Sequence, residues 1–236
     1  MKAVVIAGGK GTRLKPYTTA FPKPLMPIGD KPILEIIVRQ LKAQNIREIV
    51  MLVGHLGELI TAFFGDGSRF GVNITYSREE QPLGTVGCLS LIKQEVDDAF
   101  ITINGDTLTA LNFSDLIDYH KRNNAITTIA LNKRRVYIDF GVVQVDGSNE
   151  VKGYAEKPTL ESLVSMGVNA MSPEVLNYIE PNKYLDFPML IHTLIAHGKK
   201  VNAFIFDGYW LDIGRPDDYE KANSEIGEIY GKLGIG

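Results

Sequence analysis

"VVIAGGKGTRLKPYTTAFPKPL" (residues 4–25) passes from a short apolar run into three glycines and then into a loop rich in positive charge. The apolar run predicts a buried β-strand. Gly8, Gly9 and Gly11 permit positive φ angles and carry no Cβ, so the backbone N–H groups around them can converge on an anion. The basic residues of the loop are Lys10, Arg13, Lys15 and Lys23. Glycines without side chains and several basic residues, directly after a strand, predict a phosphate-binding loop.

Two well-known phosphate motifs do not fit this loop. The dinucleotide fingerprint GxGxxG requires glycine where the chain has Leu14, and the Walker pattern requires Ser or Thr where it has Gly11. The missing fingerprint disfavours a nucleotide-dependent dehydrogenase. A helix is not expected directly after the glycines, because the loop contains Pro16, Pro22, Pro24 and Pro27. We therefore expect a long, stiff loop over the end of a strand.

The pattern around this loop is that of an α/β protein. Short, nearly continuous apolar runs predict strands over residues 3–7, 48–54, 72–77 and 100–106, and amphipathic stretches between them predict helices. Such alternation predicts a Rossmann-like three-layer sandwich with a mainly parallel, mixed central sheet. The second half of the chain has strand-like pieces separated by short turns, which predicts a mixed or antiparallel lobe. The stretch FSDLIDYHKRNN predicts a helix with Ser114 as its N-cap. No linker after this helix marks a domain boundary.

Composition limits the classes of function. The chain has 236 residues, 44% hydrophobic and 22% charged, with a formal net charge of -3, which is typical of a soluble globular protein and not of a general nucleic-acid binder. No apolar run reaches eighteen residues, so neither a membrane span nor an export signal is expected. Cys88 is the only cysteine and has no partner for an internal disulfide. A cytoplasmic location fits these features.

An isolated GGxG could equally shape an ordinary turn, but its context favours a nucleotide site. GGKGTRLKP followed closely by PKPL resembles the signature of the sugar-1-phosphate nucleotidyltransferases. The resemblance implies that Arg13 holds the β and γ phosphates of a nucleoside triphosphate and that Lys23 reaches the reacting phosphate. It also implies that the nucleotide is contacted by Ala7, Gly8, Gly9, Gly11 and Thr12.

Further family motifs follow in order along the chain. REEQPLGTVG (residues 78–87) resembles the segment that reads the base, which implies contacts from Gln81 and Gly84. INGDTL and GYWLDIG place Asp106 and Asp212 where the family holds Mg²⁺, and carboxylates are the ligands that this ion prefers. Taken alone, each of these motifs is also compatible with a turn or a helix cap. The resemblance makes Arg13, Lys23 and Asp106 the catalytic residues.

Motifs in the second half imply a sugar-phosphate site. FGVV matches a family segment in which glycine, here Gly141, lets the backbone approach the sugar. YAEKP supplies Glu156 for the sugar hydroxyls and Lys157 for the sugar phosphate. Where many members have Asn-Ala-Gly, alignment on SPEVL places Ser165 and Gly167. We expect Ser165 to contact the sugar and Asn169 to face out of a strand.

The implied reaction is transfer of a nucleotidyl group from a nucleoside triphosphate to a sugar 1-phosphate. The overall match is most similar to mannose-1-phosphate and heptose-phosphate guanylyltransferases, which favours GTP. Glucose-1-phosphate thymidylyltransferases and a non-catalytic sensor subunit of the same fold are the alternatives. We expect one catalytic domain over residues 1–236, with a nucleotide-binding part (1–132), a sugar-binding part (133–215) and a C-terminal helix (216–232). The resemblance leaves a homo-oligomer open.

Overall fold

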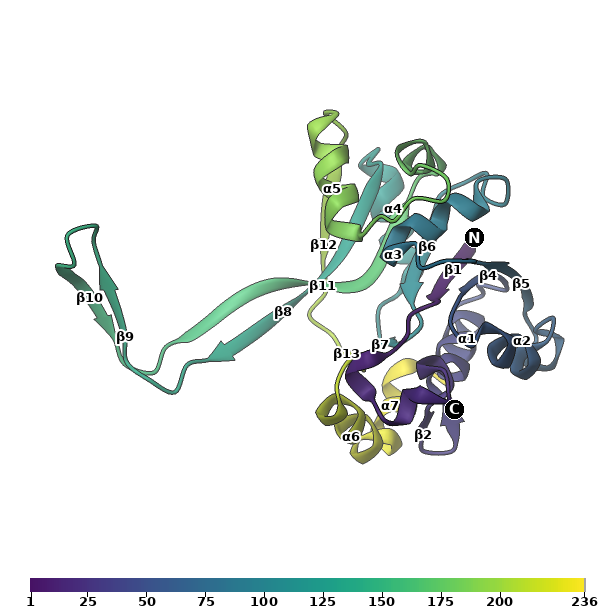
Figure 1. The fold of residues 1–236 in the computed structure, drawn as a ribbon, viewed down its shortest axis with the longest axis horizontal. Helices are drawn as coiled ribbons and strands as arrows, with labels where there is room; N and C mark the ends of the chain where they lie inside the picture. The colour runs from purple at the N-terminus through teal and green to yellow at the C-terminus, as the bar shows by residue number, and fades with distance from the viewer. Residues whose placement is uncertain (236) are drawn as a thin grey trace.

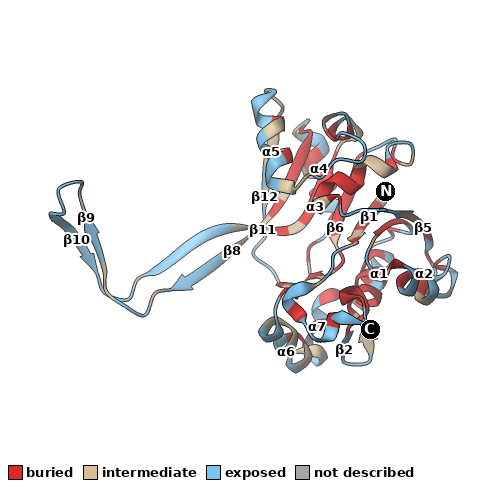
Figure 2. Cartoon of the chain, viewed as in Figure 1, coloured by how far each residue is buried: buried red, intermediate tan, exposed pale blue. Residues whose placement is uncertain are grey.

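Strand β1 (Lys2–Ala7) is an interior strand of the central sheet, and both of its faces are covered. The computed structural model describes residues 1–235. Val4 packs into one hydrophobic cluster and its neighbour Val5 into another, because successive side chains of a strand point to opposite faces. The apolar run that opens the chain therefore forms the centre of a sandwich with a core on each side of the sheet (Figures 1 and 2).

Seven strands form the central sheet within residues 1–235, in the order β12-β8-β11-β6-β1-β4-β5. All neighbouring pairs are parallel except those of β11, which runs antiparallel to β6 and to β8. The bounds are β4 (Glu48–Val53), β5 (Asn73–Arg78), β6 (Phe100–Asn104), β8 (Thr127–Tyr137), β11 (Thr159–Met171) and β12 (Val201–Ile205). The mainly parallel, mixed sheet confirms the fold class predicted from the sequence.

Helices cover both faces of this sheet. One layer contains α1 (Ile33–Ala43), α2 (Gly57–Phe64), α4 (Phe113–Arg122), α6 (Pro216–Ser224) and α7 (Ile226–Leu233). The other contains α3 (Gly84–Gly87) and α5 (Phe187–Ala196), with the 3-10 helices η5 (Cys88–Ile92) and η6 (Pro173–Tyr178). The buried residues in Figure 2 lie in the sheet and on the helix faces turned toward it.

Two details differ from the sequence predictions. The single C-terminal helix expected over 216–232 is divided into α6 and α7, which meet at Glu225. Helix α4 is capped by Asn112 and not by Ser114, because the Asn112 carboxamide oxygen accepts from the N–H groups of Ser114 and Asp115. An Asx residue just before the first helical turn is a strong N-cap, and Ser114 already lies inside that turn.

Two short antiparallel pairs border the sheet. Strand β7 (Thr107–Thr109) pairs with β13 (Trp210–Asp212), and Thr107 lies opposite Asp212. Strand β2 (Pro27–Ile28) pairs with β3 (Lys31–Pro32). The first pair joins segments about a hundred residues apart at the carboxyl end of β6. Within residues 1–235, none of the helices has the length and hydrophobicity needed to cross a lipid bilayer.

The outer halves of β8 and β11 leave the body of the molecule as a two-stranded ribbon, which continues into β9 (Val142–Val145) and β10 (Val151–Ala155). We call residues 131–165 the arm. Figure 1 shows the arm projecting away from the sandwich, and Figure 2 shows it exposed along most of its length. The lobe expected in the second half is therefore an extended ribbon in this structure.

Candidate active site

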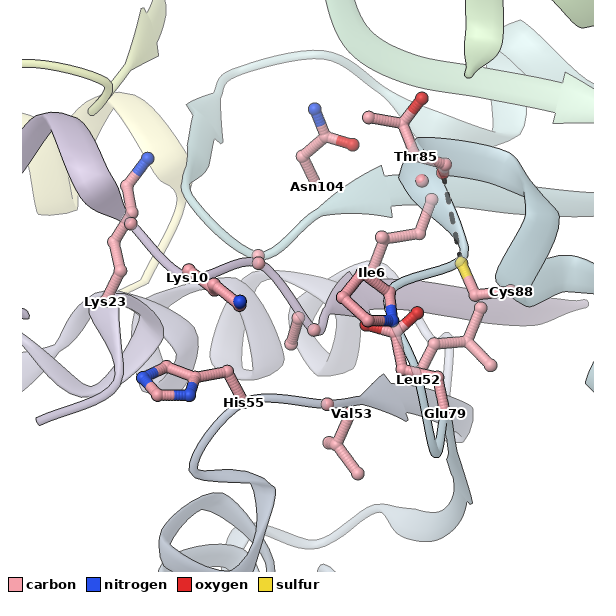
Figure 3. Close-up of a pocket in the computed structure, with 18 of the residues that line it drawn as sticks. Ile6, Lys10, Lys23, Leu52, Val53, His55, Glu79, Thr85, Cys88 and Asn104 are labelled. Carbon is pink, nitrogen blue, oxygen red and sulfur yellow. Dashed lines mark hydrogen bonds between the residues drawn. The ribbon is translucent and has the colours of Figure 1, made fainter. Parts of the chain in front are cut away.

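A cleft of about 1100 Å³ opens at the carboxyl ends of the parallel strands. This is the edge at which α/β sheets bind ligands. Its lining comes from the ends of four strands, through Ala7–Gly11 after β1, Val53–His55 after β4, Ser77–Gln81 around the end of β5 and Asn104–Asp106 after β6. Figure 3 shows Lys10 and His55 reaching into the cleft, with Asn104 across from them.

The glycine loop follows β1 as a chain of short 3-10 turns and not as an α-helix. These turns are η1 (Thr12–Leu14), η2 (Tyr17–Thr19) and η3 (Lys23–Leu25). Gly11 has a φ of +60°, and a Cβ there would lie 3.0 Å from both Thr18 Cγ2 and Lys23 Cβ. Its carbonyl accepts a hydrogen bond of 2.7 Å from the Thr18 hydroxyl. Glycine at this position thus lets the loop fold back and place Lys23 against its first turn.

Gly8 and Gly54 make room for an acidic side chain, that of Glu79. A Cβ on Gly8 would lie 2.5 Å from Glu79 Oε1, and a Cβ on Gly54 would contact the same oxygen. The other carboxylate oxygen accepts from the Leu83 N–H at 3.0 Å. Partial burial raises the pKa of the Glu79 carboxyl, and the Leu83 bond opposes that rise. Gly9, by contrast, faces open space, since a Cβ there would meet nothing within 4 Å.

Lys23 and Asp106 form an ion pair at the wall of the cleft. Lys23 is buried, with 8% of its surface exposed, although it lies in a loop. The Lys23 ammonium contacts Asp106 Oδ2, and the second carboxylate oxygen, Oδ1, is buried without a hydrogen-bond partner. A buried carboxylate oxygen without a partner is costly and calls for a ligand.

Asp212 and Arg13 complete this cluster. Strand pairing sets Asp212 opposite Thr107, next to Asp106, and the Ile213 N–H donates to the Asp106 carbonyl at 3.0 Å. Burial raises the pKa of Asp212, the neighbouring Asp106 carboxylate raises it further, and the charges of Lys23 and Arg13 lower it. A Cβ on Gly214 would lie 3.2 Å from Asp212 Oδ2 and 3.3 Å from both terminal nitrogens of Arg13. The structure therefore brings these four charged residues together.

The residues expected at the base lie on the opposite wall. Gln81 and Gly84 both line the cleft, and the Gln81 side chain donates to the Asn182 carbonyl at 3.2 Å. Gly84 has a φ of +79°, and a Cβ there would lie 2.6 Å from the Leu185 carbonyl oxygen. Asp186 accepts from the Tyr184 hydroxyl and from the Thr85 N–H at 3.1 Å, and these bonds, chiefly that of Tyr184, lower the pKa of its carboxyl.

The residues expected at the sugar phosphate lie elsewhere. Gly141, Glu156 and Lys157 all belong to the arm and do not line the cleft. They are close to one another, because the Tyr154 hydroxyl donates to Glu156 at 3.1 Å and also packs against Gly141. Lys157 is exposed and lies 3.4 Å from Asp139. The structure thus gathers these residues on the ribbon and separates them from the four charged residues of the cleft.

Ser165 lies at the root of the arm, where β11 changes register between Ser165 and Asn169. Gly167, two residues on, has a φ of +71°, and a Cβ there would lie 2.6 Å from the amide nitrogen of Asn104, a cleft residue. The prediction that Asn169 faces out of a strand is wrong. It is buried, and its side chain donates to the Thr102 hydroxyl at 3.1 Å, because this part of β11 lies between β6 and β8 with Asn169 directly opposite Thr102.

Asp106 and Asp212 suit a hard divalent cation. Two neighbouring carboxylates, one with an unpartnered buried oxygen, provide the oxygen ligands that such ions prefer. Among residues 1–235 there is no group of three or more His, Cys, Asp or Glu side chains arranged around a metal position. Two carboxylates are enough protein ligands for a cation such as Mg²⁺, which is usually held by one or two carboxylates together with substrate phosphates and water.

Sequence reasoning missed several residues that line the cleft. Glu79 stands two positions before Gln81, just past β5, and its place at a strand end was a usable signal. Asp186 is 101 residues from Thr85, and no sequence pattern links the two. Cys88 also lines the cleft, where burial raises the pKa of its thiol to about 12. At neutral pH such a thiol is protonated and is a poor nucleophile.

Comparison with known proteins agrees with this architecture. The chain is 34% identical over 241 residues to a UTP–glucose-1-phosphate uridylyltransferase of Synechocystis, covering 94% of this chain and 62% of that protein. It is 33% identical over 230 residues to a mannose-1-phosphate guanyltransferase of Yarrowia lipolytica, covering 93% and 62%. The chain thus spans less than two thirds of the length of these curated relatives.

A solved structure shares the fold. HddC from Yersinia pseudotuberculosis superimposes with a TM-score of 0.76 at 25% identity, over 95% of this chain and 99% of that one. The nucleotidyl transferase family model matches residues 2–229, which include the glycine loop, both aspartates of the cleft and the arm. With the match extending over nearly the whole sandwich and its cleft, the chain belongs to the nucleotidyl transferase family.

Proposed function

We propose that this chain transfers a nucleotidyl group from a nucleoside triphosphate to a sugar 1-phosphate. The observation that carries the proposal is the convergence of Arg13, Lys23, Asp106 and Asp212 beside an open glycine loop. A phosphate oxygen of the sugar 1-phosphate attacks the α-phosphorus, the bond from the α-phosphorus to its bridging oxygen breaks, and pyrophosphate leaves. Both reactants are anions, so the site must neutralise their charge and align them.

Each group of residues has a part in this reaction. The loop Ala7–Thr12 lies along the nucleotide, and Arg13 binds the β and γ phosphates. Lys23 approaches the reacting phosphate, where it stabilises negative charge in the transition state. Gln81 and Gly84 face the base. Gly141, Glu156, Lys157 and Ser165 form the sugar-phosphate side, so that the nucleotide-binding part is 1–132 and the sugar-binding part is 133–215.

Asp106 and Asp212 are the residues that would hold Mg²⁺. The ion, when bound, would neutralise charge on the phosphates of the nucleotide. Because these two carboxylates lie beside Lys23 and Arg13, they would hold the cation next to those basic side chains. This arrangement requires no protein nucleophile, which agrees with the protonated, buried Cys88.

GTP with a mannose- or heptose-type sugar 1-phosphate is the substrate pair that we favour, in a cytoplasmic enzyme. The similarity to the Yarrowia mannose-1-phosphate guanyltransferase supports this choice. The similarity to the Synechocystis uridylyltransferase supports the alternative of another nucleotide with glucose 1-phosphate.

Pyrophosphate release tests the proposal. The protein is incubated with Mg²⁺, with each of GTP, dTTP, UTP, CTP and ATP, and with mannose, glucose and heptose 1-phosphates in turn. We expect turnover with GTP and mannose or heptose 1-phosphate and a loss of turnover in K23A. Turnover only with another nucleotide and sugar 1-phosphate would change the assigned specificity. No pyrophosphate release with any combination would favour a non-catalytic sensor.

A further inference from the structure

The arm exposes an apolar surface that a two-stranded ribbon cannot cover by itself. Val143 lies opposite Tyr154, and Val145 lies opposite Val151, so all four side chains share one face of the β9–β10 pair. Their exposed fractions run from 46% to 67%. Within residues 1–235, β9 and β10 pair only with each other. An isolated two-stranded ribbon is at best marginally stable in water, so this face requires a partner surface.

The arm is a continuation of β8 and β11 beyond the central sheet. β8 and β11 pair without interruption from Leu131 and Ser165 at the root to Tyr137 and Thr159. The stretch from Ser165 to Thr159 alone spans about 20 Å, at about 3.3 Å per residue. Glu156 and Lys157 lie beyond it. Because β8 runs parallel to β6 and β1, the arm leaves the sheet at the carboxyl edge, where the cleft opens, but it continues outward, and none of the described arm residues lines the cleft of its own chain.

The cleft of one chain is incomplete without these residues. Its nucleotide side is lined by Arg13, Lys23 and Asp106, with Asp212 beside Asp106, whereas the proposed sugar-phosphate residues Glu156 and Lys157 are on the arm. If the proposed function is correct, a productive site needs an arm, and in this structure no arm lies over the cleft. A second copy of the chain can supply one without any change in the ribbon.

We propose that two copies of this chain exchange arms, so that the arm of each copy lies across the cleft of the other and brings Glu156 and Lys157 to it. This inference rests on the proposed function for the role of the two residues, but not for the contact itself. A two-fold axis makes both contacts equivalent and covers both apolar faces at once.

The distal arm is complementary in charge to the glycine loop, which forms one part of the cleft lining. The distal arm, residues 138–158, has four acidic side chains against two basic ones, whereas the glycine loop, residues 8–25, has four basic side chains and no acidic one. Opposite net charges favour approach and orient the two surfaces. The cleft side also offers apolar area, since Tyr17, Phe21 and Tyr184 are 63%, 43% and 59% exposed.

Sedimentation of the purified full chain tests the contact. We expect a dimer at micromolar concentration. V145E places a charge on the apolar face and should weaken the dimer at least about 100-fold, to a monomer. Q144E is the matched control, because Gln144 is the adjacent residue on the opposite face of β9, and this variant should remain dimeric. A monomeric wild-type protein would overturn arm exchange, even if that protein is an active enzyme.

Complementation tests whether Lys157 acts on the partner's cleft. K23A and K157A chains carrying different affinity tags are co-expressed, and the mixed dimer is purified through both tags. With exchanged arms, one of its two clefts has both lysines, so about half of the wild-type turnover should return although each parent is inactive. A mixed dimer as inactive as its parents would overturn the supply of Lys157 by the partner.

The two proposals fail in different ways. A wild-type dimer that is separated by V145E and left intact by Q144E supports arm exchange, whether or not the protein is active. If such a dimer reacts with no sugar 1-phosphate, the proposed function is wrong. An active monomer retains the proposed function and rejects arm exchange.

Discussion

Lys23 and Asp106 are 83 residues apart in the chain and form an ion pair at the wall of the cleft. The pair joins the glycine loop to the end of β6, and only Asp106 Oδ2 takes part in it. Because Oδ1 is buried without a partner, the pair is poised to accept further cationic or donor groups. Its position makes Lys23 and Asp106 the first residues to test.

K23A should lower kcat by about 10² to 10³, as expected when a positive group that stabilises transition-state charge is removed. K15A is the matched control, because Lys15 belongs to the same loop but is exposed and does not line the cleft. Steady-state pyrophosphate release measures both variants. Equal turnover of K23A and K15A would show that Lys23 is not a catalytic residue.

D212N should raise the Mg²⁺ concentration needed for half-maximal activity by at least about tenfold, since one of two charged ligands becomes a neutral amide. The matched control is D217N, in which an exposed aspartate five residues further along the chain is changed. Titration of activity with Mg²⁺ gives the comparison. An unchanged midpoint in D212N would mean that Asp212 is not a metal ligand.

The two glycines Gly11 and Gly9 should respond differently to alanine. G11A forces a left-handed φ on alanine and crowds Thr18 and Lys23, so it should cost about 1–2 kcal/mol and lower Tm by roughly 2–8 °C. G9A meets open space, so its Tm should stay within about 1 °C of the wild type while nucleotide affinity falls. Thermal unfolding and calorimetric titration with nucleotide separate the two effects. Normal nucleotide affinity in G9A would show that the ligand does not approach this part of the loop.

His120 should make the stability of the protein depend on pH. It is 1% exposed, its ring nitrogens bond the hydroxyls of Thr128 and Ser172, and burial lowers its pKa. Below the pKa of an unfolded histidine, the unfolded chain binds a proton that the folded chain does not. Stability is therefore lost as pH falls through that range, by up to about 1.4 kcal/mol per pH unit.

Urea unfolding at several pH values between 5 and 7.5 checks this prediction. The difference in unfolding free energy between the wild type and H120Q should shrink or reverse as pH falls, because glutamine takes no proton. H197Q is the control, since His197 is exposed and outside the core. If the difference in unfolding free energy between the wild type and H120Q does not change with pH, the pKa of His120 is the same in the folded and the unfolded chain.

Much of the fold was predictable because it is local in origin. β1 and β4 are continuous apolar runs, α1 repeats its apolar residues with helical period, and the prolines after Gly11 exclude a helix there. These features depend on neighbours in the chain, so residue patterns report them. The division of the C-terminal helix at Glu225 and the choice of Asn112 as a cap depend on single residues at boundaries, where patterns are weakest.

The relative placement of residues that are far apart in the chain was harder to predict from the sequence. The sequence offered Asp106 and Asp212 as separate strand-end carboxylates, and only the register of β13 on β7 makes them neighbours. Motif spacing likewise could not show that Glu156 and Lys157 would lie on a ribbon away from the cleft. Asn169 was misplaced because burial of a strand position depends on which strands flank it and what covers its face, and Asn169 lies where β11 is paired with both β6 and β8.

We propose that nucleotide phosphates bind where the loop after β1 meets Asp106 and Asp212. A crystal structure with a non-hydrolysable GTP analogue and Mn²⁺, in which anomalous scattering locates the metal, tests this placement. We expect one metal peak between the carboxylates of Asp106 and Asp212, with the triphosphate beside Gly9 and Arg13. A triphosphate or metal bound at any other place on the molecule would contradict it.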